Sequence, residues 1–92
     1  MKISHARLGT QTYWKELKKL IEKQDYKCAL TGDVISFDMN IELDHKLPKY
    51  RGGLNDLLNV QWVTKEANWF KRALTETELL ILCEKIISTL KK

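Results

Sequence analysis

Several features are scarce in this sequence, and each absence excludes a class of protein. The 92 residues contain one proline, no internal repeat and no low-complexity tract, so neither a repeat architecture nor a linker-like chain is indicated. No apolar run approaches the ~20 residues that span a bilayer. The first residues also lack the apolar stretch of a secretory signal. These absences predict a cytoplasmic protein that makes no membrane contact.

Cysteine is also scarce, with only Cys28 and Cys83, far apart in the sequence. Neither belongs to a Cys-x-x-Cys pair, so no zinc knuckle is indicated. A disulfide between them is disfavoured in a cytosolic setting. We therefore predict that both cysteines are small buried hydrophobic residues.

The composition that remains is that of one globular domain, with 43% hydrophobic and 30% charged residues over residues 1–92. The net charge of +4 is unevenly distributed. Residues 28–44 carry four acids and no base, whereas residues 45–75 carry six bases and two acids. Excess positive charge suits a polyanionic partner, although lysine-rich surfaces also serve only to keep proteins soluble.

Hydrophobic spacing in the first half of the chain predicts one helix and two extended segments. Apolar residues at helical spacing predict a helix over residues 12–24. Residues 26–33 have the composition of a short strand and a turn. Alternation of apolar and polar residues predicts a strand that ends at His45, over residues 35–45.

The second half predicts a long loop, a strand and two helices. Residues 46–59 form a loop that is long for a small domain, and such loops are usually functional or disordered. Residues 60–63 are strand-like, and Thr64 is placed to cap a helix through residue 74. The buried side of this helix is expected to carry Ala67, Phe70 and Leu74. Asn68, Lys71 and Arg72 are then expected on its other side. Residues 75–78 form a capping box, and the helix after it carries an apolar stripe that we expect in the core: Leu79, Cys83, Ile86, Ile87 and Leu90.

Polar residues at three points of this pattern have the chemistry that phosphodiester hydrolysis needs. His45 suits proton abstraction from water, because an unperturbed imidazole titrates near pH ~6.5. Asp44 and Asn68 offer oxygen ligands, which suit Mg²⁺ or Mn²⁺ better than zinc. Adjacent residues of a straight strand point to opposite faces, so Asp44 and His45 share one site only if the strand bends or ends there.

Four segments in order, residues 43–48, 51–53, 59–62 and 68–71, resemble the signature of the HNH endonuclease family. The resemblance covers residues 26–72, about half of the chain. It implies an α+β fold with a ββα-metal, or His-Me finger, core, here flanked by an N-terminal and a C-terminal helix. By the same resemblance, His45 is the general base and Asn59 is the middle residue that braces the loop and orients the base. Asp44 and Asn68 are the metal ligands, which makes the chain an HNN variant.

The function implied is a metal-dependent DNA endonuclease that uses a histidine base and one Mg²⁺ or Mn²⁺ ion. No structural zinc is expected, because the cysteine pairs found in many relatives are missing. Double-stranded DNA with weak sequence preference is the expected partner, and a bacterial or phage origin is expected. Five basic residues are candidate phosphate contacts: Lys46, Lys49, Arg51, Lys71 and Arg72.

Other interpretations of the same residues stay open. Asp44 and His45 are also explained as a hydrogen-bonded structural pair, and Asn59 as a turn residue. At the level of function, the alternatives are a nucleic-acid-binding module that lost catalysis and a small phage-type protein-interaction factor. The sequence indicates neither the biological role nor the oligomeric state.

Overall fold

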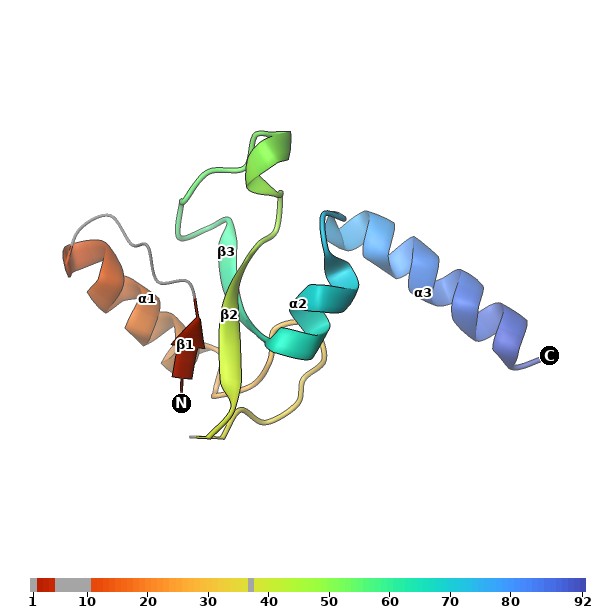
Figure 1. The fold of residues 1–92 in the computed structure, drawn as a ribbon, viewed down its shortest axis with the longest axis horizontal. Helices are drawn as coiled ribbons and strands as arrows, with labels where there is room; N and C mark the ends of the chain where they lie inside the picture. Colours follow the sequence, from red (N-terminus) through yellow and green to blue (C-terminus); the bar gives the residue numbers. More distant parts are fainter. Residues whose placement is uncertain (1, 5–10, 37) are drawn as a thin grey trace.

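The computed structural model describes residues 2–4, 11–36 and 38–92, which form a small α+β fold (Figure 1). Its elements follow in the order β1 (Lys2–Ser4), α1 (Gln11–Lys23), β2 (Asn40–His45), the 3-10 turn η1 (Lys49–Arg51), β3 (Val60–Thr64), α2 (Lys65–Lys71) and α3 (Glu76–Leu90). The α+β class expected from the sequence is confirmed. Among the described residues, no helix is both long and apolar enough to cross a membrane.

The sheet has three strands in the order β1-β2-β3, with β2 in the centre. β2 runs parallel to β1 and antiparallel to β3, and in the second pairing Asp44 lies opposite Gln61 and His45 opposite Val60. β1 was not predicted from the sequence, because three residues are too few to show an alternating pattern.

The two faces of the sheet are covered by different helices. Ile41 of β2 and Trp62 of β3 face α1, where they form the main core with Leu17 and Ile21. The Trp62 indole Nε1 donates to the backbone oxygen of Leu17 at 2.7 Å, which fixes the helix on the sheet. On the other face, Val63 packs with Ala67 of α2. Because side chains alternate along a strand, Glu42 and Asp44 also point toward α2.

Most predicted elements are present, with shifted boundaries. The helix predicted over residues 12–24 and the strand over 60–63 are confirmed as α1 and β3. Thr64 caps α2 as expected, accepting a hydrogen bond from the backbone nitrogen of Ala67 at 3.2 Å. The helix ends at Lys71, short of residue 74, because Arg72 adopts a positive φ of 50°.

The extended segments before β2 are shorter than predicted. The segment predicted as a strand and a turn, residues 26–33, makes one isolated antiparallel bridge, from Lys27 to the following Val34, which closes a turn through Gly32 at a φ of 77°. The strand predicted over residues 35–45 begins only at Asn40, because a turn precedes it, in which the Met39 nitrogen donates to the Ser36 oxygen at 3.2 Å. This local hydrogen bond between Ser36 and Met39 thus takes the place of strand pairing just before β2.

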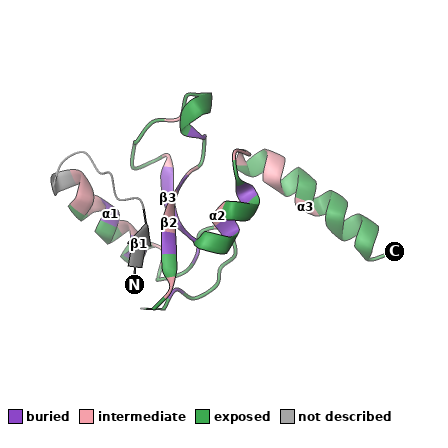
Figure 2. Cartoon of the chain, viewed as in Figure 1, coloured by how far each residue is buried: buried purple, intermediate pink, exposed green. Residues whose placement is uncertain are grey.

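The last helix begins at the residue that the sequence predicted, but it is not packed in the core as the sequence predicted. Thr75 and Glu78 form the expected capping box at the start of α3. The predicted burial of its apolar stripe is wrong, because no residue of this fully described helix is buried and α3 projects away from the sheet (Figures 1 and 2). Cys28 is a buried free thiol as expected, but Cys83 is only partly buried. A periodic pattern shows that a helix has an apolar face and does not show what covers it.

Candidate functional site

Asp44 is the buried centre of the polar network between β2 and α2. Its side chain is 3% exposed, and its Oδ1 lies 2.9 Å from the Lys71 ammonium. Its Oδ2 accepts a hydrogen bond from Gln61 Nε2 at 3.0 Å. The same ammonium donates to the backbone oxygen of His45 at 3.1 Å. Both carboxylate oxygens therefore have cationic or amide partners, which is what a buried charge requires.

The predicted solvent-facing position of Lys71 is wrong, since its side chain is 0% exposed. In the sequence pattern, Ala67 and Phe70 marked the buried side of the helix. In the structure, Ala67 and Lys71 are buried one turn apart, and Phe70 is half exposed. In this orientation of the helix, the Lys71 ammonium reaches the Asp44 carboxylate on the facing strand. Lys71 is therefore a structural counter-ion in this arrangement and not a surface contact for phosphate.

Asn68 lies on the same side of α2 as Lys71 and contacts Glu42. Its Nδ2 donates to Glu42 Oε1 at 2.7 Å. Glu42 precedes Asp44 by two residues on β2, so both carboxylates face α2. Glu42 was not singled out from the sequence, although this spacing was a signal for it. The structure thus places Asp44 and Asn68 on one face, each bonded to a different partner.

His45 is the last residue of β2, at the point where the chain leaves the strand for the long loop. It is half buried, and its Nε2 lies 2.7 Å from Oδ1 of Asn55 in the long loop. An amide oxygen only accepts hydrogen bonds, so Nε2 carries the proton and Nδ1 is the basic nitrogen of the neutral ring. Asn55 was missed from the sequence, because a loop residue ten positions away gives no periodic signal.

Asn59 holds the two ends of the loop together. Its Oδ1 accepts from the Leu47 nitrogen at 2.9 Å, and its Nδ2 donates to the oxygens of Leu47 at 3.1 Å and Leu54 at 2.9 Å. Its backbone oxygen also accepts from the nitrogen of Lys46 at 2.8 Å. The loop that follows His45 is therefore a defined structure, braced at the position that the family resemblance implied.

The other predicted phosphate contacts differ in how accessible their charged groups are to a polyanion. Lys46 and Lys49 are exposed in the loop. Arg72 is exposed and lies over the Trp69 ring, 4.9 Å from its centroid. Arg51 instead pairs with Glu78 of α3 and donates to the backbone oxygen of Ala73 at 3.2 Å. Hydrogen bonding to Arg51 lowers the pKa of Glu78 to about 2.

Gln61 connects the buried pair to the start of α3. Besides Asp44, its Nε2 donates to Oε1 of Glu76 at 2.8 Å. The first turn of α3 is thus attached to the domain through Glu76 and Glu78, although the rest of the helix projects. Neither contact was predicted from the sequence, because both depend on where the chain turns after α2.

Groups of three or more His, Cys, Asp or Glu side chains that would hold a metal ion are not found within the described ranges. The predicted ligands Asp44 and Asn68 are only two residues, fewer than such a group contains, and their metal binding stays a prediction. Comparison of the chain with protein-family models, curated proteins and solved structures gives no match. The function proposed below therefore depends on the sequence pattern and on the geometry of this site.

Proposed function

We propose that this chain is a metal-dependent endonuclease of the HNH type, which hydrolyses phosphodiester bonds of double-stranded DNA. In this proposal β2, β3 and α2 form a ββα-metal core. The observation that carries it is the setting of His45, which is half buried at a strand end, oriented by Asn55 and followed by a loop that Asn59 braces. A general base needs this combination of access and fixed orientation.

The proposed chemistry at His45 follows from its hydrogen bond. Asn55 holds the Nε2 proton, so Nδ1 takes a proton from the attacking water. The Asn55 oxygen also stabilises the imidazolium that forms, because it keeps accepting from Nε2 after protonation. Asn59 acts through the loop and is a positioning residue, because its side chain contacts backbone atoms of Leu47 and Leu54.

Asp44 and Asn68 would hold the divalent ion, and their oxygen donors fit Mg²⁺ or Mn²⁺ in type. When bound, such an ion neutralises phosphate charge and stabilises the leaving oxygen. The ammonium of Lys71 already lies 2.9 Å from Asp44 Oδ1, so a cation has to compete with it. We therefore expect weak, exchangeable metal binding and no metal requirement for folding.

Phosphate contacts are proposed for Lys46, Lys49 and Arg72, the candidates that are exposed and carry no carboxylate partner among the described residues. Such contacts position the backbone and do not read base sequence. Sequence preference should therefore be weak, and affinity should fall steeply with salt.

The proposal is tested by incubating supercoiled plasmid with the protein and Mg²⁺. Cleavage is expected, and His45→Ala should reduce it by roughly 10²–10⁴-fold, the usual contribution of a general base. Melting temperature and DNA affinity of His45→Ala should stay near those of the native protein. Glu22→Ala, on the exposed side of α1, is the matched control. A folded His45→Ala protein that still cleaves at the native rate would overturn the assignment.

One observation favours a second candidate, a nucleic-acid-binding module without catalysis. The buried pair of Asp44 and Lys71 gives the carboxylate a complete structural role without a metal ion. This candidate predicts salt-sensitive DNA binding and no Mg²⁺-dependent cleavage by the native protein. The same plasmid experiment therefore separates the two functions.

A further inference from the structure

The proposed function does not use the apolar face of α3, which is exposed along most of the helix. At 100° per residue, seven side chains of α3 cover an arc of roughly 160°: Leu79, Leu80, Leu82, Cys83, Ile86, Ile87 and Leu90. An arc of this width is typical of a helix packed in a core. Yet Leu80 is 62%, Ile87 54% and Leu90 78% exposed.

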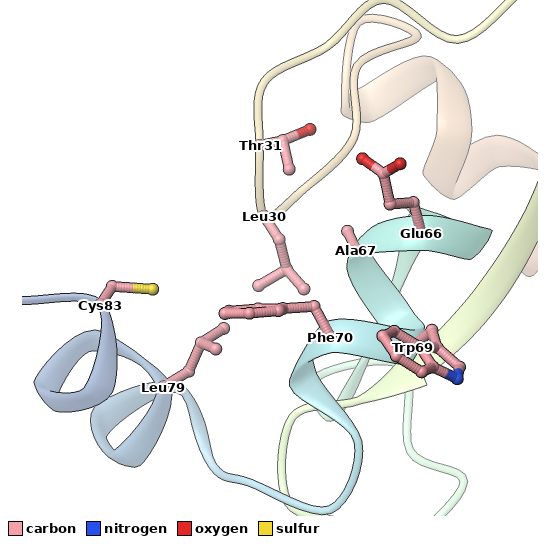
Figure 3. Close-up of a pocket in the computed structure, with 8 residues that line it drawn as sticks. All are labelled: Leu30, Thr31, Glu66, Ala67, Trp69, Phe70, Leu79 and Cys83. Carbon is pink, nitrogen blue, oxygen red and sulfur yellow. The ribbon is translucent and has the colours of Figure 1, made fainter. Parts of the chain in front are cut away.

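The N-terminal end of this face continues into an apolar groove between α3 and α2. The groove has a volume of about 410 Å³, and Leu30, Phe70, Leu79 and Cys83 point toward one another in it (Figure 3). Leu79 and Cys83 lie at the centre of the apolar arc of α3. The groove and the helix face are therefore one surface, which begins against α2 and extends along the projecting helix.

The charges along α3 indicate what covers this surface. Acidic residues stand at the N-terminal end, where Glu76 and Glu78 form the first turn, and Lys91 and Lys92 follow the last turn. An antiparallel second copy of the helix would bring each lysine-bearing end to an acidic end. It would also oppose the two helix dipoles. A parallel copy would instead place like charges and like dipole ends together.

We propose that α3 pairs with α3 of a second copy of this chain in an antiparallel two-fold dimer. Placing Glu76 beside Lys91 of the second copy sets the two-fold axis between Cys83 and Glu84. The same register brings Leu80 beside Ile87 of the second copy. The C-terminal half of each helix then covers the groove of the other protomer, so the same surface is used twice, as a two-fold interface requires.

The size of this surface is sufficient for a reversible dimer. A 15-residue helix is roughly 22 Å long, and pairing along it together with the two grooves buries on the order of 1,000 Å². This is at the lower limit for specific interfaces. Dimerisation should therefore depend on concentration in the micromolar range and is not needed for folding of the sheet.

The first test is sedimentation velocity of the full chain over a range of concentrations. The native protein is expected to dimerise, and Ile87→Glu should weaken the dimer at least tenfold. Leu58→Glu is the matched control, because Leu58 is 84% exposed in the long loop and should leave the dimer intact. A native protein that stays monomeric at all concentrations would overturn the proposal. The apolar face of α3 would then be covered in another way, by its own domain or by a different protein.

The second test determines the direction of pairing by disulfide crosslinking under mild oxidation. Leu80→Cys and Ile87→Cys are made separately in a Cys83→Ser background and then mixed. Antiparallel pairing predicts crosslinks mainly between the two variants, and few within either variant alone. Crosslinks that form equally well within the Leu80→Cys protein alone would indicate parallel pairing and contradict the proposed arrangement.

Discussion

At the scale of single residues, the buried pair of Asp44 and Lys71 dominates the site. Two charges that are 3% and 0% exposed lose most of their hydration, and only good geometry offsets that cost. Here the ammonium has two oxygen acceptors and the carboxylate has two donors. Removing one partner leaves the other charge buried without a counter-ion, so both single changes should be far more harmful than a surface substitution.

Lys71→Met is expected to lower the free energy of unfolding by roughly 3–5 kcal/mol, the usual effect of leaving a buried charge uncompensated. Methionine is one atom shorter than lysine, so it keeps most of the apolar side chain and removes the charge together with its two hydrogen bonds. Adding Asp44→Asn should recover part of the loss, because Gln61 Nε2 still donates to an amide oxygen at that position. Urea unfolding measures the free energy of unfolding of the single and the double variant. A double variant less stable than Lys71→Met would contradict the proposed role of the pair.

The same variants test whether Asp44 binds a divalent ion. Without the competing ammonium, Mg²⁺ should raise the melting temperature of Lys71→Met more than that of the native protein. The shift should disappear in the Asp44→Asn, Lys71→Met protein, which lacks the carboxylate. If Mg²⁺ changes neither melting temperature, Asp44 is not a metal ligand, and this result does not depend on any cleavage assay.

Asn59→Ala should reduce both stability and cleavage, because three side-chain hydrogen bonds that hold the loop are lost. A loss of roughly 1–3 kcal/mol in the free energy of unfolding is expected for these bonds. Asn59→Asp keeps the acceptor for the Leu47 nitrogen but places a carboxylate oxygen against the carbonyl oxygens of Leu47 and Leu54, so it should not restore stability. Melting curves and plasmid cleavage are measured on each. Lost cleavage at unchanged stability would instead indicate a direct chemical role for Asn59.

At the scale of elements, the sequence predicted where the helices begin better than it predicted which helix face is buried or where a helix ends. The Thr64 and Thr75 caps marked where α2 and α3 begin, because capping is a local interaction of a few residues. The face of α2 that is buried depends on Asp44, far away in sequence, so Lys71 was placed on the wrong side. The prediction that α3 is buried was wrong for the same reason. Burial of an apolar face depends on which other surface packs against it, and the hydrophobic pattern of the helix carries no information about that surface.

The contact between Arg51 and Glu78 attaches α3 to the long loop, and it should depend on pH. Glu78 has a pKa of about 2 in the fold, against its ordinary value of 4.5. A lowered carboxyl pKa stabilises the folded state above pH 4.5, and this contribution is lost as the pH falls toward 2. The native protein should therefore melt higher than Glu78→Gln at neutral pH, by a difference that shrinks over this interval.

Thermal melting of the native protein and of Glu78→Gln at several pH values gives the difference in melting temperature directly. The contributions of the other titrating groups are the same in both proteins and largely cancel in this difference. The effect should be small, because both side chains are partly exposed to solvent. A difference that stays constant between neutral pH and pH 2 would show that the capping role of Glu78, and not its ion pair with Arg51, determines its contribution.

At the scale of the whole molecule, the projecting helix gives the chain an elongated shape, with extents of 50 × 31 × 19 Å. The sequence pattern singled out Asp44 and Asn68, whose side chains lie between β2 and α2, and His45 and Asn59, which lie at the two ends of the long loop. It did not locate Asn55 or Gln61, whose contacts arise only once the loop and the two strands are assembled. The antiparallel dimer proposed above would carry two such sites on one particle.

If both the nuclease and the dimer proposals hold, the two sites should cut both strands of one duplex in a single encounter. The native protein at dimer-forming concentration should then convert supercoiled plasmid to linear DNA with little nicked intermediate. Ile87→Glu should produce mainly nicked circles at early times, with a rate per site within a few-fold of native, because residue 87 lies in α3 and not in the β2–α2 site. Dilution of the native protein should change the products in the same direction.

Absence of all cleavage would contradict the nuclease proposal alone. Equal product ratios from a demonstrated dimer and its monomeric variant would show that the two sites act independently.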